Sequence, residues 1–395
     1  MRTGVKQWCK ESLPRLIRLQ FFAVTGIVVF QVLGKSSVAS MLFTATFFLT
    51  LLIWVCRGLL GLRQIHRIGL LILLCSGISV VGNGLITQTG VSFGYFRKWL
   101  MFCTTILFLS VTGEYCPDRK EIRMILRGST FLSVFLVGMY GCFPEQMHLL
   151  NGRVSGYLTF RFTNPNLTAV FLSAISMLQW IQAADSRGIK RCLFAGLGGI
   201  LIWFVIQTQS RNAQLVMAFF LLVWLLAIAG KGIALYGGIR WAAAVFPLLF
   251  SLGYLLLIRL PVVQRLFGFL AGEGKNLDSR VWIWKMALQN VMDSPLLGAY
   301  SQISNGTGSS QMHNSHLDVL ASYGVPAFCL VCWLLHRLLE PVGRGRRAYL
   351  CRMAFLSLLL SGMGEAMLFS GGMGIYLLFG FFRMLANVPA KEEPV

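Results

Sequence analysis

The sequence predicts an all-α integral membrane protein with about twelve transmembrane helices, and three observations support this fold class. The chain has 395 residues, of which 56% are hydrophobic and only 12% charged, and its mean hydropathy of +0.69 is too high for a soluble domain of this size. Apolar stretches long enough to cross a bilayer recur along the whole chain. Lys and Arg gather in alternate connections between these stretches, as in the cytoplasmic loops of membrane proteins.

The predicted spans follow from the requirement that a helix needs ~20 mostly apolar residues to cross the bilayer. They are 19–34, 37–56, 68–88, 98–113, 126–143, 166–184, 190–208, 212–230, 241–258, 316–336, 350–368 and 370–387. The first span follows a basic N-terminus, as in a signal peptide. Its apolar core of ~15 residues and the faint site Val38-Ala39-Ser40 favour an uncleaved helix.

The basic residues also predict the orientation of the chain. An even number of spans with both termini in the cytoplasm places 24 of the 35 Lys and Arg residues on the cytoplasmic side. A formal net charge of +21 is also typical of nucleic-acid-binding proteins, but those concentrate the charge on one face or in a tail. Here the charge is spread over short loops. We therefore expect membrane lipids as partners, no nucleic acid, and a single polytopic membrane domain over 1–395.

Two segments stand out as long external connections. They are 144–165 and the larger extracytoplasmic loop 259–315, which joins the ninth and tenth predicted helices. The larger loop is rich in Gly, Asn and Ser, residues that favour turns. Its middle part, 281–292, has helical periodicity. Long loops in compact proteins are often functional, so this loop is a candidate site.

A few arginines fall on the external side, where the insertion bias disfavours them. Among them are Arg153 and Arg161 in the first external segment, Arg211 in a short turn, and Arg280 at the start of the helical part of the large loop. Such residues can anchor the protein at lipid headgroups. They can also line an outward anion-binding cavity, since a guanidinium matches the oxygens of a phosphate.

Two of the five histidines lie together at the end of the large loop, as His313 and His316. Histidine pairs in polar loops are often simply solvated, although imidazole is also the side chain that exchanges protons near neutral pH. No Cys, Asp or Glu cluster completes a zinc ligand set, so we expect no metal. Asp318 and Glu365 fall in predicted spans, where acids are costly and become functional candidates. Asp318 also suits the interfacial first turn of a helix.

Several motifs together resemble the O-antigen ligase and polymerase superfamily, over roughly residues 150 to 335. They are Arg161-Phe162-Thr163-Asn164-Pro165-Asn166, Ser210-Arg211, Ser279-Arg280-Val281-Trp282-Ile283-Trp284, Asp293-Ser294-Pro295-Leu296-Leu297-Gly298, and His313-Asn314 followed, after nine intervening residues, by Gly324. The ligase motif of the family ends in Gly-x-x-Gly. Here Ala327 replaces the second glycine.

The resemblance implies a GT-C-like glycosyltransferase of the bacterial cytoplasmic (inner) membrane, acting on its outer face without metal or other cofactor. Its donor is a polyprenyl-diphosphate-linked glycan, and its acceptor is a hydroxyl of a lipid or a growing glycan. His313 is expected to be the base, with Arg211 and Arg280 on the diphosphate. Substrate contacts are expected from Arg153, Arg161, Asn166, Asn314 and His316. The chemistry agrees, because a diphosphate leaving group needs fixed positive charge and an acceptor hydroxyl needs a base.

Two other classes of protein remain open at this stage. A transporter or flippase of lipid-linked glycans would use the same arginines without chemistry, although such proteins often carry internal repeats, and no repeat is apparent here. A non-catalytic membrane scaffold would leave the external arginines unexplained. The sequence does not distinguish a ligase from a polymerase, because the two share these motifs.

Overall fold

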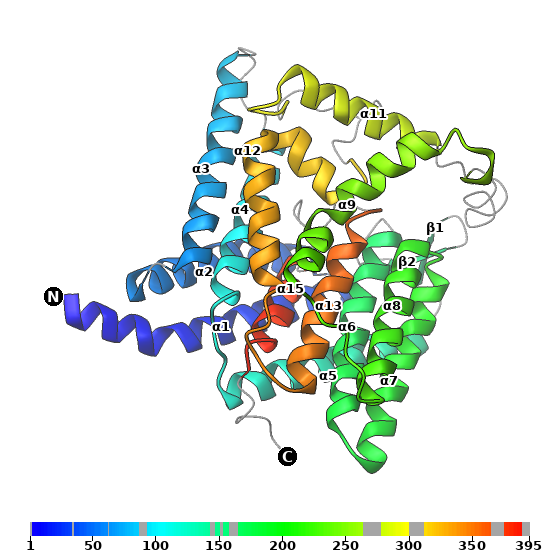
Figure 1. The fold of residues 1–395 in the computed structure, drawn as a ribbon. Coiled ribbons are helices and arrows are strands. Elements are labelled where there is room, and N and C mark those ends of the chain that lie inside the picture. Colours follow the sequence, from blue (N-terminus) through cyan, green and yellow to red (C-terminus); the bar gives the residue numbers. More distant parts are fainter. Residues whose placement is uncertain are drawn as a thin grey trace.

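The computed structural model describes residues 2–33, 35–61, 63–86, 93–142, 147–150, 153–157, 165–263, 278–299, 312–364 and 375–388. The helices are α1 Arg2–Val32, α2 Ser36–Leu60, α3 Gln64–Ile86, α4 Phe93–Thr112, α5 Arg119–Cys142, α6 Pro165–Asp185, α7 Gly188–Gln207, α8 Arg211–Ile228, α9 Gly237–Leu257, α11 Asp278–Asp293, α12 Ser315–Leu338, α13 Arg346–Ser361 and α15 Ile375–Leu385. Figure 1 shows their arrangement, with α1 lying across the long axes of α3 and α12.

Each of the twelve predicted spans overlaps one of these helices. Within the described ranges, nine helices are long and apolar enough to cross a membrane: α1, α2, α3, α5, α6, α7, α8, α9 and α12. Of the helices that match predicted spans, α4, α13 and α15 fall outside that set, and so does α11, which lies in the large predicted loop. α13 has 16 residues and α15 has 11, fewer than the ~20 that a full crossing needs. The structure thus confirms a helical, multi-pass membrane protein, and the count of twelve spans stays a prediction.

The two long segments predicted to be external contain regular structure within the described residues. The helical part predicted over 281–292 is confirmed as α11, Asp278–Asp293. In the first external segment a short antiparallel hairpin pairs β1, Met147–Leu150, with β2, Arg153–Tyr157, and the register shifts between His148 and Leu149. The sequence analysis does not predict this hairpin. Its strands are too short to show a clear alternating pattern.

The helices divide into buried and peripheral ones. In α6 and α12, 89% and 61% of the apolar stretch is buried, against 22% in α2 and α7. α6 packs against α5, α7, α8 and α13, while α12 packs against α3, α9 and α11. In Figure 1, α3, α4 and α12 gather on one side of the molecule and α6, α7, α8 and α13 on the other. A helix that is apolar all round suits the interior, and one that exposes large apolar side chains suits contact with lipid.

Contacts between α4 and α12 define the two ends of the helical bundle. Near their starts, Lys98 of α4 pairs with Asp318 of α12, with 2.9 Å between Nζ and Oδ1. Just after α4, a Cβ placed on Gly113 would lie 2.5 Å from Leu338 at the end of α12. The helices therefore run in the same direction. We refer to the His313 end and the Leu338 end of the bundle.

α12 bends sharply at Gly324, whose φ of 78° lies in the left-handed region. A Cβ at this position would lie 2.2 Å from the carbonyl oxygen of Leu296, so only glycine admits such a close approach. The segment 293–298 after α11 docks here, with hydrogen bonds from Ala299 N to Ala321 O (2.8 Å) and from Val325 N to Pro295 O (2.8 Å). The bend thereby fixes α11 against α12.

Candidate functional site

A short turn after α13, residues 361–364, holds the starts of two other helices. The Nδ2 group of Asn212, in the first turn of α8, donates a hydrogen bond to the carbonyl of Ser361 (2.6 Å). The amide of Ser315, at the start of α12, donates to the carbonyl of Gly362 (2.8 Å). The starts of α8 and α12, about a hundred residues apart in sequence, therefore meet at one turn, which we call the α13 turn.

Arg280 and Asn212 lie beside the same glycine of the α13 turn. A Cβ placed on Gly364 would be 3.0 Å from the side-chain amide of Asn212 and 3.4 Å from Nη1 of Arg280. Arg280 is half-buried, and Arg211, which begins α8 next to Asn212, is exposed. A guanidinium partly shielded from water interacts more strongly with an anion than a fully solvated one. The structure therefore brings Arg280 and the start of α8 together.

Asn314 fastens the start of α12 to its surroundings. Its Oδ1 atom caps the helix by accepting hydrogen bonds from the amides of His316 (3.0 Å) and Leu317 (2.9 Å). Its Nδ2 group lies 2.6 Å from both the Pro247 carbonyl and Ser251 Oγ, and 3.3 Å from the Met363 carbonyl. The side chain is fully buried. Asn314 thus links α12 to α9 and to the α13 turn. The sequence predicted a substrate contact for this residue and did not predict this structural role.

His316 also links two helices from a buried position. It is fully buried, and its Nε2 atom lies 2.6 Å from the carbonyl of Ala244 in α9. Because a carbonyl only accepts, Nε2 carries the proton of this bond. Pro247 inside α9 has no backbone N–H, so the helix lacks the hydrogen bond that residue 247 would make to the carbonyl of Ala243, next to Ala244. His316 is therefore engaged in holding α9 against α12.

His313 is held by its neighbours in an unusual backbone conformation. Its φ is 48°, in the left-handed region that costs a residue with a Cβ ~1–2 kcal/mol. Before it, the carbonyl of Met312 accepts a hydrogen bond from Nε1 of the buried Trp284 of α11 (3.0 Å), and the Met312 amide interacts with Asp318. After it, Asn314 caps α12 as described. The half-buried imidazole is thus presented from a fixed loop.

The same strain occurs at the start of α8. Among the described residues, Gln209 and His313 are the two with a Cβ and a left-handed φ, and each lies just before a helix that meets the α13 turn. Strained backbone of this kind is often found at functional sites, where the surrounding contacts hold it in place. Both the start of α8 and the start of α12 therefore show a feature typical of a working site.

Asp318 lies one turn into α12, next to this loop. It is almost fully buried and forms the ion pair with Lys98 of α4, and His313 is close enough to influence its charge. An acid inside a membrane protein needs a partner, so the sequence could have suggested a nearby cation. Lys98, in the fourth predicted span, was not proposed as that cation. Asn212 and the α13 turn were also missed, because uncharged residues give no such signal.

The remaining predicted residues are not brought to this cluster by the described contacts. Asn166 is half-buried in the first turn of α6. Arg153 begins β2, and its side chain lies outside the described residues, as do Arg161 and Glu365. Their predicted roles stay predictions. The structure thus gathers His313, Arg280 and the Arg211–Asn212 pair around the α13 turn.

Comparisons with known proteins add no family to this picture. The sequence matches no protein-family model, and a search of curated proteins returned no match. The resemblance described above therefore rests on the motif residues alone. The cluster contains a half-buried guanidinium, a neighbouring exposed one and a half-buried imidazole just before α12. Such groups can bind an anion and exchange a proton within one site.

Proposed function

We propose that this protein is a membrane glycosyltransferase of the O-antigen ligase or polymerase type. It transfers a glycan from a polyprenyl-diphosphate carrier to a hydroxyl of a lipid or of a growing glycan. The observation that carries the proposal is the meeting of Arg280, the Arg211–Asn212 start of α8 and the His313–Asn314 loop around the α13 turn. Motifs that are far apart in the sequence pattern therefore lie around one turn, which supports the proposal.

The reaction follows from the groups in the cluster. The acceptor hydroxyl gives its proton to His313 as its oxygen forms a bond to the anomeric carbon of the donor sugar. The bond between that carbon and the diphosphate oxygen breaks, and the polyprenyl diphosphate leaves with the electron pair. Arg280 and Arg211 bind the negative charge that develops on the leaving group. Attack from the side opposite the leaving group inverts the anomeric configuration.

The architecture proposed for this activity is GT-C-like, with twelve membrane crossings in the bacterial inner membrane and both termini in the cytoplasm. The two ends of the bundle support this orientation. The connections 113–118 and 339–345 lie at the Leu338 end, and basic residues flank them: Arg119 and Lys120 after the first, and Arg337, Arg344, Arg346 and Arg347 around the second. His313 lies at the other end, with Lys98 nearby. Positive charge in short loops marks the cytoplasmic side.

Cysteine labelling in intact cells tests this orientation. Single cysteines go into a variant that lacks the ten native ones, at Ser309 for the outside and at Val342 for the inside. Val342 is exposed, whereas a side chain at the adjacent Gly343 would lie 2.3 Å from the carbonyl oxygen of Ala386. An impermeant thiol reagent should label the first variant and not the second. Equal labelling of both variants would contradict the proposed orientation and, with it, the external position of the site.

The function itself is tested with purified protein in lipid vesicles that contain a polyprenyl-diphosphate-linked glycan and candidate acceptors. We expect covalent transfer, seen as a lengthened or lipid-joined glycan together with released polyprenyl diphosphate. The transporter alternative predicts instead that the carrier crosses the vesicle bilayer while its glycan remains attached. Transbilayer movement without transfer would replace our proposal with that alternative. A polymerase lengthens the lipid-linked glycan, and a ligase moves it to a different lipid.

A further inference from the structure

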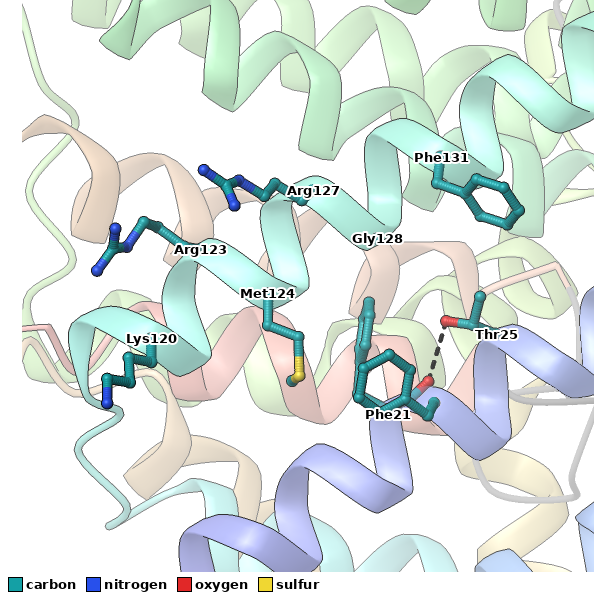
Figure 2. A pocket seen from close by; sticks show the side chains of 9 residues that line it. Phe21, Thr25, Lys120, Arg123, Met124, Arg127, Gly128 and Phe131 are labelled. Carbon is teal, nitrogen blue, oxygen red and sulfur yellow. Dashed lines mark hydrogen bonds between the residues drawn. The ribbon is translucent and has the colours of Figure 1, made fainter.

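A groove of about 700 Å³ lies between α1 and α5, away from the cluster around His313. Its lining includes Phe21, Thr25, Lys120, Arg123, Arg127 and Phe131 (Figure 2). α5 begins only a few residues after α4 ends, which places the groove toward the Leu338 end of the bundle. The groove and the His313 cluster are therefore separate sites.

One end of the groove is strongly basic. Lys120, Arg123 and Arg127 follow one another at spacings of three and four residues, so they lie along one face of α5. All three side chains are exposed, and none forms an ion pair within the described part of the chain. Arg123 hydrogen-bonds only through Nε, to the carbonyl of Arg119 (3.2 Å). Three cations are therefore available to bind an anion that is not part of the protein.

The other end of the groove is apolar and aromatic. Phe131 and Phe22 are 55% and 60% exposed, although each lies in a helix that can cross a membrane. Such side chains on a transmembrane helix are placed to contact lipid chains. Phe131 is eight residues beyond Arg123, a distance of about 12 Å along α5 at 1.5 Å per residue. Figure 2 shows the basic side chains toward one end of this stretch of α5 and Phe131 toward the other.

The floor of the groove depends on a close approach of the two helices. A Cβ placed on Gly128 of α5 would lie 2.3 Å from the ring of Phe21, which is almost fully buried. The glycine lets this ring of α1 lie directly against α5, and the ring in turn packs edge-on against Phe381 of α15 (5.2 Å between centroids). The floor of the groove is therefore part of the packed core.

From these features we infer that the α1–α5 groove binds an anionic phospholipid of the surrounding bilayer. The phosphate of the headgroup lies among Lys120, Arg123 and Arg127, and an acyl chain runs along α5 toward Phe131. Basic pockets between transmembrane helices on the cytoplasmic side recognise anionic headgroups in this way, through charge and an adjoining apolar wall. The inference does not depend on the proposed glycosyl transfer.

The test measures lipid binding to the purified full-length protein by native mass spectrometry and by thermal unfolding. Detergent micelles contain phosphatidylcholine alone or phosphatidylcholine with phosphatidylglycerol. We expect phosphatidylglycerol to bind and to raise the Tm. Substituting Lys120→Gln, Arg123→Gln and Arg127→Gln together should weaken that binding on the order of a hundredfold, because each basic residue near a membrane surface contributes about a factor of five.

The matched control removes the same number of charges outside the groove, through Arg119→Gln, Arg187→Gln and Lys190→Gln, all of which are exposed. This variant should retain binding. An equal loss in both triple variants would mean general charge attraction and would overturn the inference, as would unchanged binding in the groove variant. If the groove triple variant does not fold, Arg127→Gln alone should still bind measurably less phosphatidylglycerol.

A final arm separates a lipid from a free anion. Inorganic phosphate and glycerol phosphate carry the same charged group without acyl chains. We expect neither to raise the Tm of the wild-type protein as phosphatidylglycerol does, and we expect Phe131→Ala to weaken binding of the lipid. A full effect of inorganic phosphate, or no effect of Phe131→Ala, would show that the groove takes a small anion and would overturn the inference of a lipid site.

Discussion

The His313 cluster and the α1–α5 groove both contain arginines, but the two sites hold them differently. In the cluster, Arg280 is half-buried beside the α13 turn, and buried amides and helix starts fix the backbone around it. In the groove, Arg123 and Arg127 are exposed on one helix face. A fixed, partly shielded guanidinium suits a charge that develops during a reaction. Exposed cations suit an anion that arrives by diffusion within the bilayer.

The largest expected effect comes from His313. Because general base catalysis contributes typically ~10²–10⁴ in rate, His313→Ala should lower transfer by that factor and leave carrier binding nearly unchanged. His316→Ala should act differently, since it removes the bond to the Ala244 carbonyl and should lower stability by ~1–3 kcal/mol. Transfer per folded molecule and thermal unfolding, measured on both variants, separate the two effects. If His313→Ala kept full turnover, His313 would not be the general base.

The next comparison sets Arg280 against Arg211. Arg280→Lys keeps the charge but loses the planar fork, and we expect ~2–4 kcal/mol of lost transition-state stabilisation, or roughly thirty- to a thousand-fold in rate. Arg211 is exposed, so Arg211→Lys should cost less, roughly two- to fivefold. Arg259→Lys, on an exposed residue just beyond α9, serves as the control. Near-normal transfer in both Arg280→Lys and Arg211→Lys would exclude the phosphate role.

A smaller effect is expected from Gly364→Ala. The added Cβ would lie 3.0 Å from the side-chain amide of Asn212, which is tighter than an ordinary contact, and 3.4 Å from Nη1 of Arg280. Displacing a binding group by about 1 Å can lower a rate ~100-fold, and the shift needed here is a few tenths of an ångström, so we expect roughly two- to tenfold less transfer. Gly253→Ala in α9 is the control, because a Cβ there meets no atom within 4 Å. If Gly364→Ala and Gly253→Ala transferred glycan equally fast, the position of Arg280 beside the α13 turn would have no bearing on activity.

The smallest effect on transfer should come from the groove. The triple variant of Lys120, Arg123 and Arg127 changes residues at the Leu338 end, so its transfer per folded molecule in phosphatidylcholine vesicles should equal that of the wild type. The measurement is the initial rate of glycan transfer, normalised to folded protein. A fall as large as that of Arg280→Lys would break the distinction between the two regions and indicate that the groove takes part in the reaction.

Much of the helical architecture was predictable, and the reason is the bilayer. Long apolar runs have one available structure in a membrane, because their backbone groups must satisfy one another. Each predicted span therefore overlaps a helix, and α11 was also foreseen from its periodicity. The hairpin of β1 and β2 was not, since two short strands in a polar loop give a weak pattern.

Residue type and spacing are enough to predict a multi-pass helical membrane protein, and they mark His313, Arg280 and Arg211 as candidate residues on the side predicted to be external. The packing of the helices decides which of the candidates meet and which are engaged inside the protein. His316 is three residues from His313, yet its Nε2 is bound to α9, and Asn314 is used inside the protein. The α13 turn, with no charged residue of its own, joins α8 and α12. Sequence records residue type and spacing along one helix, whereas contacts between distant segments depend on how the helices pack.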